Sequence, residues 1–132
     1  MSVENTRKVI TRYFEADHDA TSMLAEDVVF TIMATGEENK GRQAVLAMLE
    51  YFYNGAFKAT AERTSLVIGE NSAVLEARVV GTHAGEFAGI PATGKAIDVP
   101  LCVVYDIEGD FISRGRVYFE TPALMKQLGI GD

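Results

Sequence analysis

The first residues of the chain place apolar and charged side chains at helical spacing. Charged side chains fill one side, and the other side forms an apolar stripe made of Val3, Thr6, Ile10, Tyr13 and Phe14. This pattern predicts an amphipathic helix whose apolar face covers a core. Further along, the pattern predicts, in chain order, a short helix around 23–24, a strand over 28–33, a polar turn over 36–41 and a helix over 42–53.

From about residue 60 onward the spacing of the apolar residues changes to two, which is typical of strands. β-Branched, aromatic and alternating residues predict strands over 64–69, 72–87, 96–107 and 111–120. Pro100 lies within the third strand and should mark an edge or a bulge, because proline donates no backbone hydrogen bond. A short helix is predicted to follow, with Thr121 as its N-cap, Pro122 in its first turn and Gly129 as its C-cap.

Helices followed by consecutive strands predict an α+β fold. The length of 132 residues suits one domain and is too short for two ordinary ones, so we treat residues 1–132 as a single domain. The only cysteine, Cys102, cannot form an internal disulfide. A reducing, cytoplasmic location is therefore expected.

Acidic residues outnumber basic ones by 19 to 12, which gives a net charge of -7. Such a protein repels the phosphates of nucleic acids and of anionic lipids, and no apolar stretch approaches the roughly 20 residues that span a bilayer. We therefore expect neither nucleic acid nor a membrane as partner. We also expect no metal and no other cofactor, because His18 and His83 lie far apart with no cysteine cluster.

Segments of the second half carry a resemblance to a known family. They are the glycine-rich segment 81–95, the turn Glu108-Gly109, residue Glu120 and the terminal Gln127-Leu128-Gly129. With the order of helices and strands, they resemble the SnoaL-like polyketide cyclases of the nuclear transport factor 2-like superfamily. The resemblance implies a conical, curved antiparallel sheet wrapped on the N-terminal helices, a deep pocket in its concave face and a homodimer built through the sheet.

The resemblance also implies a chemistry. Some relatives close polyketide rings by aldol reactions, and others are steroid isomerases, epoxide hydrolases, hydroxylases or non-catalytic proteins. An aldol reaction needs a base, donors for the enolate oxygen and a dry cavity, and it needs no metal. In the cyclases the acid/base residue is an aspartate on the last strand, and Glu120 occupies that position. Strand alternation puts Glu120 on one face with Arg116 and Tyr118. A solvated carboxylate at a strand end is the alternative.

His83 is the second candidate for chemistry, because an unperturbed imidazole titrates near neutrality. On its predicted strand it shares a face with Leu75, Ala77 and Val79, so it should point into the apolar interior or a pocket. There it would donate a hydrogen bond or a proton to substrate, as its place in the glycine-rich segment suggests by resemblance. Alternatively, it is a core histidine bonded to a backbone carbonyl.

Tyr13 is a third candidate, since by resemblance to steroid isomerases it would be a phenol in the pocket. The alternative is a core tyrosine with its hydroxyl at the surface. The rest of the isomerase pattern is missing, because Ile32 and Met33 stand where that enzyme carries its base, and its oxyanion-hole aspartate falls near Leu101. An epoxide hydrolase is also disfavoured, because the chain offers no clear second interior carboxylate.

The sequence thus favours a cofactor-independent carbon-acid enzyme. It would be an aldol-type cyclase, or a related isomerase or lyase, acting on a polyketide-like or aromatic carbonyl compound. Glu120 would act as the base and His83 as the acid or donor, while Arg116, Tyr118 and Tyr13 would bind substrate. The alternative is a non-catalytic module that holds a small apolar ligand in the same fold. A homodimer through the outer face of the sheet is expected in either case.

Overall fold

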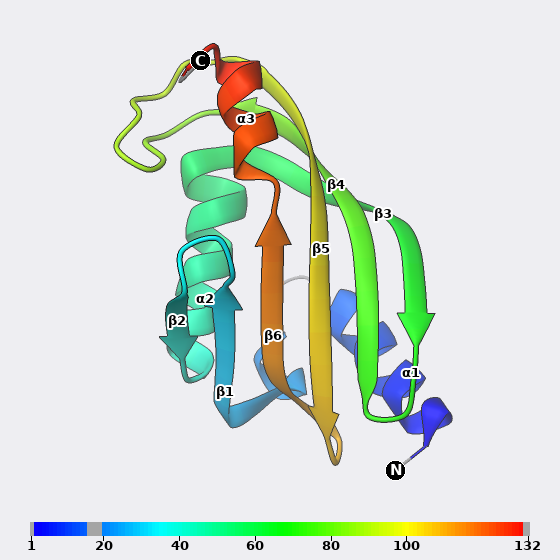
Figure 1. The fold of residues 1–132 in the computed structure, drawn as a ribbon. Helices are drawn as coiled ribbons and strands as arrows, with labels where there is room; N and C mark the ends of the chain where they lie inside the picture. The colour runs from blue at the N-terminus through cyan, green and yellow to red at the C-terminus, as the bar shows by residue number, and fades with distance from the viewer. Residues whose placement is uncertain (1, 16–19, 131–132) are drawn as a thin grey trace.

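A strongly curved six-stranded sheet forms the frame of the molecule (Figure 1). The computed structural model describes residues 2–15 and 20–130, so His18 lies outside the described residues. The strands are β1 (Leu24–Ile32), β2 (Glu37–Lys40), β3 (Phe57–Ile68), β4 (Ser72–His83), β5 (Ala96–Glu108) and β6 (Phe111–Phe119). The helical segments are α1 (Val3–Glu15), η1 (Ala20–Met23), α2 (Arg42–Glu50), η2 (Tyr51–Ala56) and α3 (Thr121–Leu128).

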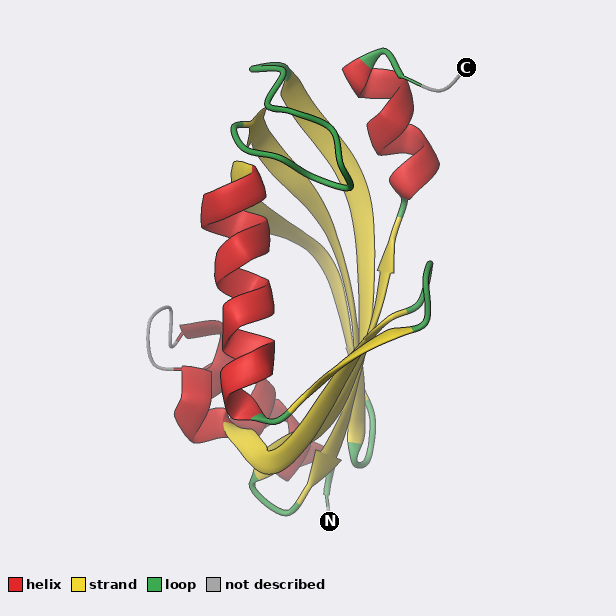
Figure 2. Cartoon of the chain, turned by 90° about the vertical axis from the view of Figure 1, so that its left-hand side faces the viewer, coloured by secondary structure: helices red, strands yellow, loops and turns green. Residues whose placement is uncertain are grey.

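The strands follow the order β2-β1-β6-β5-β4-β3 in the sheet. Neighbouring strands are antiparallel except for β1 and β6, which pair in parallel. Figure 2 shows the continuous helix of α2 and η2 lying across the concave side of the sheet, while α3 stands beyond the end of β6. The predicted α+β fold, with a conical sheet wrapped on helices, is thus confirmed.

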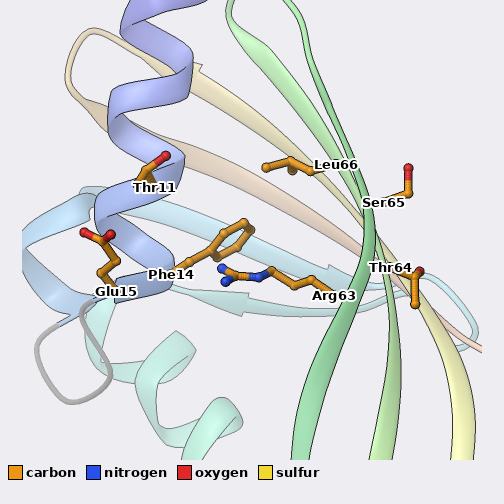
Figure 3. Close-up of a pocket in the computed structure, with 7 residues that line it drawn as sticks. All are labelled: Thr11, Phe14, Glu15, Arg63, Thr64, Ser65 and Leu66. Atoms are coloured by element: carbon orange, nitrogen blue, oxygen red, sulfur yellow. The ribbon is translucent and has the colours of Figure 1, made fainter.

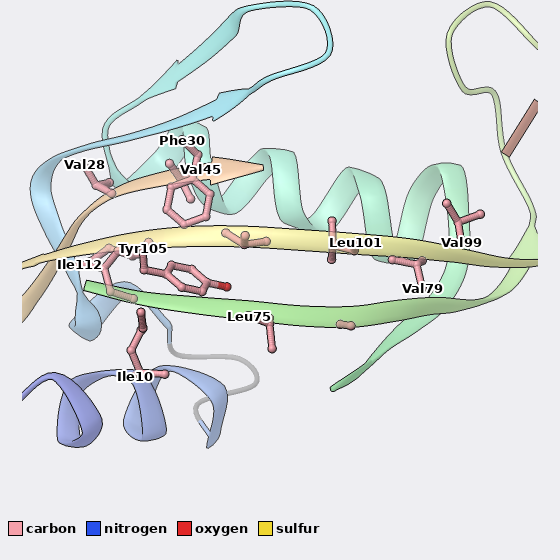
Figure 4. Packing of buried hydrophobic residues seen from close by; sticks show 14 of the residues in the cluster. Ile10, Val28, Phe30, Val45, Leu75, Val79, Val99, Leu101, Tyr105 and Ile112 are labelled. Carbon is pink, nitrogen blue, oxygen red and sulfur yellow. The ribbon is translucent and has the colours of Figure 1, made fainter. Parts of the chain in front are cut away.

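The core lies between the concave face of the sheet and the helices. On β4 and β5 alternate residues are buried, as strand geometry requires of a sheet with one covered face. Figure 4 shows part of this core, including Phe30, Leu75 and Tyr105. Gly115 has a packing role here, because a Cβ atom on it would lie 2.8 Å from the ring of Phe30.

Two predicted helix boundaries differ from the structure. The helix predicted over 42–53 ends as an α-helix at Glu50 and continues as the wider π-helix η2 through Ala56. The C-terminal helix has Glu120 rather than Thr121 at its N-cap position, and the Thr121 hydroxyl donates instead to the Phe119 carbonyl at 3.4 Å. Gly129 adopts the left-handed conformation at the C-cap, as predicted.

The predicted polar turn over 36–41 and the predicted short helix also need correction. The turn contains strand β2, which pairs with β1 and so is decided by tertiary contact rather than by propensity. The short helix is the 3₁₀ segment η1, and Leu24 already begins β1. The strand predicted to reach residue 87 ends at His83, since the glycine-rich segment beyond it leaves the sheet.

Pro100 is accommodated without a bulge. The register between β4 and β5 runs unbroken through its partner Arg78. The Pro100 carbonyl accepts a hydrogen bond from the Glu120 backbone N–H at 3.3 Å, on the side of β6. In a strand, the backbone nitrogen and the carbonyl of one residue face the same neighbouring strand. The Pro100 nitrogen therefore faces the end of β6, where no further strand residue follows. Pro100 therefore lies at a local edge of the sheet, which is one of the two predicted alternatives, an edge or a bulge.

Candidate functional site

Three tyrosines from different elements approach one another on the concave side, and we call Tyr13, Tyr53 and Tyr105 the phenol cluster. Tyr13 lies in the last turn of α1, Tyr53 in η2 and Tyr105 on the buried row of β5. The rings of Tyr13 and Tyr105 meet edge to face with centroids 5.7 Å apart. Tyr13 is thus partly buried against the core, together with two phenols that were not predicted from the sequence.

Burial keeps the phenol cluster protonated. It raises the pKa of Tyr13 and of Tyr105 well above the ordinary value, with smaller contributions from the neighbouring phenols, and it raises the pKa of Tyr53 to about 12. Within the described part of the chain, none of the three hydroxyls has a hydrogen-bond partner. The cluster thus offers neutral O–H donors to a ligand oxygen.

A cleft of about 410 Å³ opens beside this cluster, between α1 and β3. Figure 3 shows Phe14 and Arg63 pointing toward each other across it, with the Arg63 guanidinium 4.7 Å from the centre of the Phe14 ring. Phe14 in turn contacts Tyr13 and Tyr105, at centroid distances of 5.8 and 6.1 Å. Phe14 therefore separates the cleft from the phenol cluster by one aromatic ring.

His83 lies at the end of β4 and is fully buried, which confirms its predicted inward orientation. Its Nδ1 atom accepts a hydrogen bond from the Thr93 backbone N–H at 3.2 Å and lies 3.0 Å from the Thr93 hydroxyl. Because Nδ1 accepts, the proton of the neutral ring is on Nε2. Nε2 is buried without a partner among the described residues. The histidine is thus tied to the loop 84–95 rather than to a backbone carbonyl.

Glu120, Arg116 and Tyr118 share one face, as predicted, but that face is the outer, convex one. Tyr118 pairs with Cys102 and Arg116 with Val104, all on the side away from the helices. Tyr118 is 41% exposed. The Arg116 guanidinium donates to the Asp106 carboxylate at 2.8 Å. Glu120 is exposed and lines a small hollow of about 150 Å³ on this outer face, together with Tyr118 and Cys102.

A β-bulge explains why these residues face outward. The register between β5 and β6 shifts at Ser113, which is the extra residue. Before the bulge the even-numbered Ile112 is buried, and after it the odd-numbered Gly115 is buried. Even-numbered residues after the bulge, including Glu120, therefore point outward. His83 lies on the concave face, so the structure does not bring it together with Glu120, and the catalytic role of each stays a prediction.

Tyr105 and Arg63 differ in how well the sequence predicts their inward orientation. Tyr105 has the parity of the apolar residues on its strand, so alternation alone would have placed it inside. The orientation of Arg63 could not be predicted in this way, because a second bulge, at Thr64, interrupts the alternation of β3 directly after it.

The described residues contain no cluster of three or more His, Cys, Asp or Glu side chains arranged to hold a metal ion. Among the helices of residues 2–15 and 20–130, none has the length and apolar character needed to cross a bilayer.

The curved sheet and its covering helices define a fold of the nuclear transport factor 2-like class. A family profile of SnoaL-like polyketide cyclases matches residues 7–128, which is nearly the whole chain. The protein therefore belongs to the SnoaL-like polyketide cyclase family. No curated protein sequence matches the chain significantly.

Solved structures share this fold at low sequence identity. A proposed SnoaL-like polyketide cyclase from Jannaschia sp. CCS1 has a TM-score of 0.85 and 14% identity, over 98% of this chain and 94% of that one. IdmH, a proposed polyketide cyclase from Streptomyces antibioticus, has a TM-score of 0.76 and 20% identity, over 95% and 99%. A proposed ketosteroid isomerase from Kribbella flavida has a TM-score of 0.68 and 18% identity, over 88% and 78%.

Proposed function

We propose that this protein is a cofactor-independent carbon-acid enzyme, an aldol-type cyclase or related isomerase, for an aromatic or polyketide-like carbonyl compound. The phenol cluster is the observation that carries the proposal. It places protonated donors without partners in the described chain on the concave face. Its neighbouring cleft, of about 410 Å³, falls in the size range of small-molecule sites.

The proposed chemistry follows from these donors. The substrate carbonyl oxygen accepts hydrogen bonds from Tyr13 and Tyr105. When a base removes a proton from the adjacent carbon, negative charge develops on that oxygen and both hydrogen bonds strengthen. The enolate carbon then bonds to a second carbonyl carbon, whose oxygen takes up a proton as the ring closes. The raised pKa of the phenols means that they donate hydrogen bonds while keeping their protons.

We assign the base to Glu120 by its family position and the acid or donor to His83 Nε2–H, although Glu120 lies on the opposite face of the sheet from the phenols. The outward position of Glu120 favours a second candidate function, a non-catalytic module that binds a carbonyl compound through the phenols. In support of this candidate, the inward-facing positions of strands β3 to β6 as described carry no carboxylate. Both candidates use the same ligand class.

We also propose a homodimer through the outer face of the sheet. This face presents half-buried apolar side chains such as Val74, Val80 and Val104 beside the exposed Tyr118. Pairing two copies would cover this surface. It would also enclose Glu120 and Arg116, which lie on the same face.

Proton exchange tests the proposed function without knowledge of the natural substrate. The probe is 2-tetralone, a flat bicyclic ketone, and NMR in D₂O measures how fast its α-protons are replaced. We expect the protein to accelerate exchange and Tyr105→Phe to slow it by about 10²-fold, as loss of one oxyanion donor does. Tyr51→Phe removes an exposed phenol outside the phenol cluster and is the matched control.

The outcomes separate the two candidates. If Glu120→Gln keeps full exchange with the fold intact, the base assignment is wrong. Binding of 2-tetralone that depends on Tyr105 without any exchange supports the binding module instead. If Tyr105→Phe changes neither binding nor exchange, the phenol cluster is not the ligand site and both candidates fail.

A further inference from the structure

Arg63 reaches the concave side from the rim of the sheet. It pairs with the buried Ala77 across β3 and β4, and the bulge at Thr64 follows directly. The Thr64 hydroxyl donates to the Glu76 carbonyl, and Figure 3 shows Thr64 and Ser65 pointing away from α1. Bulges commonly re-aim a side chain beside a site. Here the last residue before the bulge, Arg63, points across the opening toward α1.

The Arg63 guanidinium has no carboxylate partner in residues 2–15 and 20–130. Two other arginines of this acidic protein form close ion pairs, Arg78 with Asp98 at 2.7 Å and Arg116 with Asp106 at 2.8 Å. The contact of Arg63 is the face of the Phe14 ring, which occupies none of its N–H donors. A permanently charged, planar fork of donors therefore remains available in the cleft.

Among the described residues, the other charged side chain that lines the cleft is Glu15, at the end of α1. No ion pair joins it to Arg63, so their charges are not cancelled by contact. An anionic group entering the cleft is attracted toward Arg63 and repelled from Glu15, which fixes one orientation. The rest of the lining adds apolar surface from Phe14 and Leu66 and hydroxyl groups from Thr11, Thr64 and Ser65. Of these hydroxyl-bearing residues, Thr64 and Ser65 point away from α1 (Figure 3).

We propose that the cleft binds the carboxylate of an aromatic or polyketide-derived keto acid, with Arg63 as the anion-binding residue. Arginine binds carboxylates through two parallel N–H···O bonds. Since the Phe14 ring contacts both the Arg63 guanidinium and the rings of Tyr13 and Tyr105, the ketone end of the same molecule extends past this ring toward Tyr13 and Tyr105. The inference rests on the proposed function for the ketone, and it adds a negatively charged group to the ligand class.

Two probes of matched shape separate the carboxylate from the ketone. Calorimetry at fixed salt measures binding of 6-acetyl-2-naphthoate and of neutral 2-acetylnaphthalene. We expect the acid to bind more tightly, and Arg63→Gln to weaken acid binding by about 10-fold with less than about 2-fold change for the neutral ketone. Arg114→Gln is the matched control, because Arg114 is exposed and carries no ion pair in the described chain.

A second variant tests the same proposal by removing the negative charge of Glu15. Glu15→Gln should tighten binding of the acid and leave the neutral ketone unchanged. The proposal is overturned if Arg63→Gln weakens both probes equally or neither, or if Glu15→Gln weakens acid binding. Failure of the proposed function would give a different result. Tyr105→Phe would then leave the binding of 2-acetylnaphthalene unchanged, while Arg63→Gln would still weaken the binding of the acid.

Discussion

The rings of Tyr13 and Tyr105 meet edge to face at a centroid distance of 5.7 Å, although Tyr13 lies in the last turn of α1 and Tyr105 lies on β5. Curvature of the sheet brings β5 to α1, and burial raises the pKa of both phenols. Each ring therefore contributes apolar area to the core and keeps an O–H donor. This pairing links the stability of the fold to the site proposed for ligand binding.

Alkaline pH should destabilise the protein through the phenol cluster. The folded-state pKa of Tyr53 is raised from 10.0 to about 12, and those of Tyr13 and Tyr105 are raised as well. The stability that these neutral groups contribute is therefore full below about pH 10 and is lost as the pH rises through the folded values. Urea unfolding measured from about pH 9 to about pH 12 should show this fall in the free energy of unfolding. Tyr53→Phe should reduce it and Tyr118→Phe should not.

Gly115 should tolerate no side chain. A Cβ atom there meets ring carbons of Phe30 at 2.8 to 2.9 Å, so Gly115→Ala must displace a ring that is 2% exposed. We expect a loss of about 1–3 kcal/mol in the free energy of unfolding. The neighbouring substitution Arg114→Ala, on the exposed side, should change it by less than about 0.5 kcal/mol. Equal effects of the two substitutions would contradict the packing described here.

His83 should be present as the Nε2–H tautomer when its ring is neutral. The Thr93 backbone N–H donates to Nδ1, so that atom cannot carry the proton. Two-bond ¹H–¹⁵N NMR correlations distinguish the tautomers directly. A protonated Nδ1 in the neutral ring would contradict the hydrogen bond from the Thr93 backbone N–H.

His83 should also hold the loop 84–95 against the sheet. Removing the buried ring by His83→Ala leaves a cavity, and we expect a loss of about 2–4 kcal/mol in stability. Amide hydrogen exchange should rise in the loop more than in β1 and β2, which lie at the other edge of the sheet. A uniform increase along the whole chain would argue against a specific tie between His83 and this loop.

The proposed dimer can be tested on its own face. Light scattering at micromolar protein should give twice the chain mass, and Val104→Lys should reduce it to the chain mass by placing a charge in the middle of the outer face. Val3→Lys is the control, since Val3 is 39% exposed on helix α1 and does not belong to the outer face of the sheet. A monomeric wild-type protein would remove this proposal.

Much of the fold was predictable because helix and strand periodicity are local properties. The helix beginning at Val3, the strand beginning at Ser72 and the C-cap at Gly129 follow from spacing and from single-residue preferences. Strand β2 was missed because its residues, Glu37 to Lys40, are all polar and form a strand only by pairing with β1. Strand alternation predicted the burial of His83 correctly, because no bulge interrupts the register between β4 and β5.

The sequence by itself determined the family and the order of the elements other than β2. It also determined that Arg116, Tyr118 and Glu120 share one face, since alternation along a strand fixes relative orientation. Only the tertiary structure decided which face that is. The bulges at Ser113 and Thr64 depend on pairing with the neighbouring strands, and each reverses the alternation after it. The first turned Glu120 outward, and the second follows Arg63 where it points toward Phe14. The meeting of three phenols from separate elements likewise required the curved sheet.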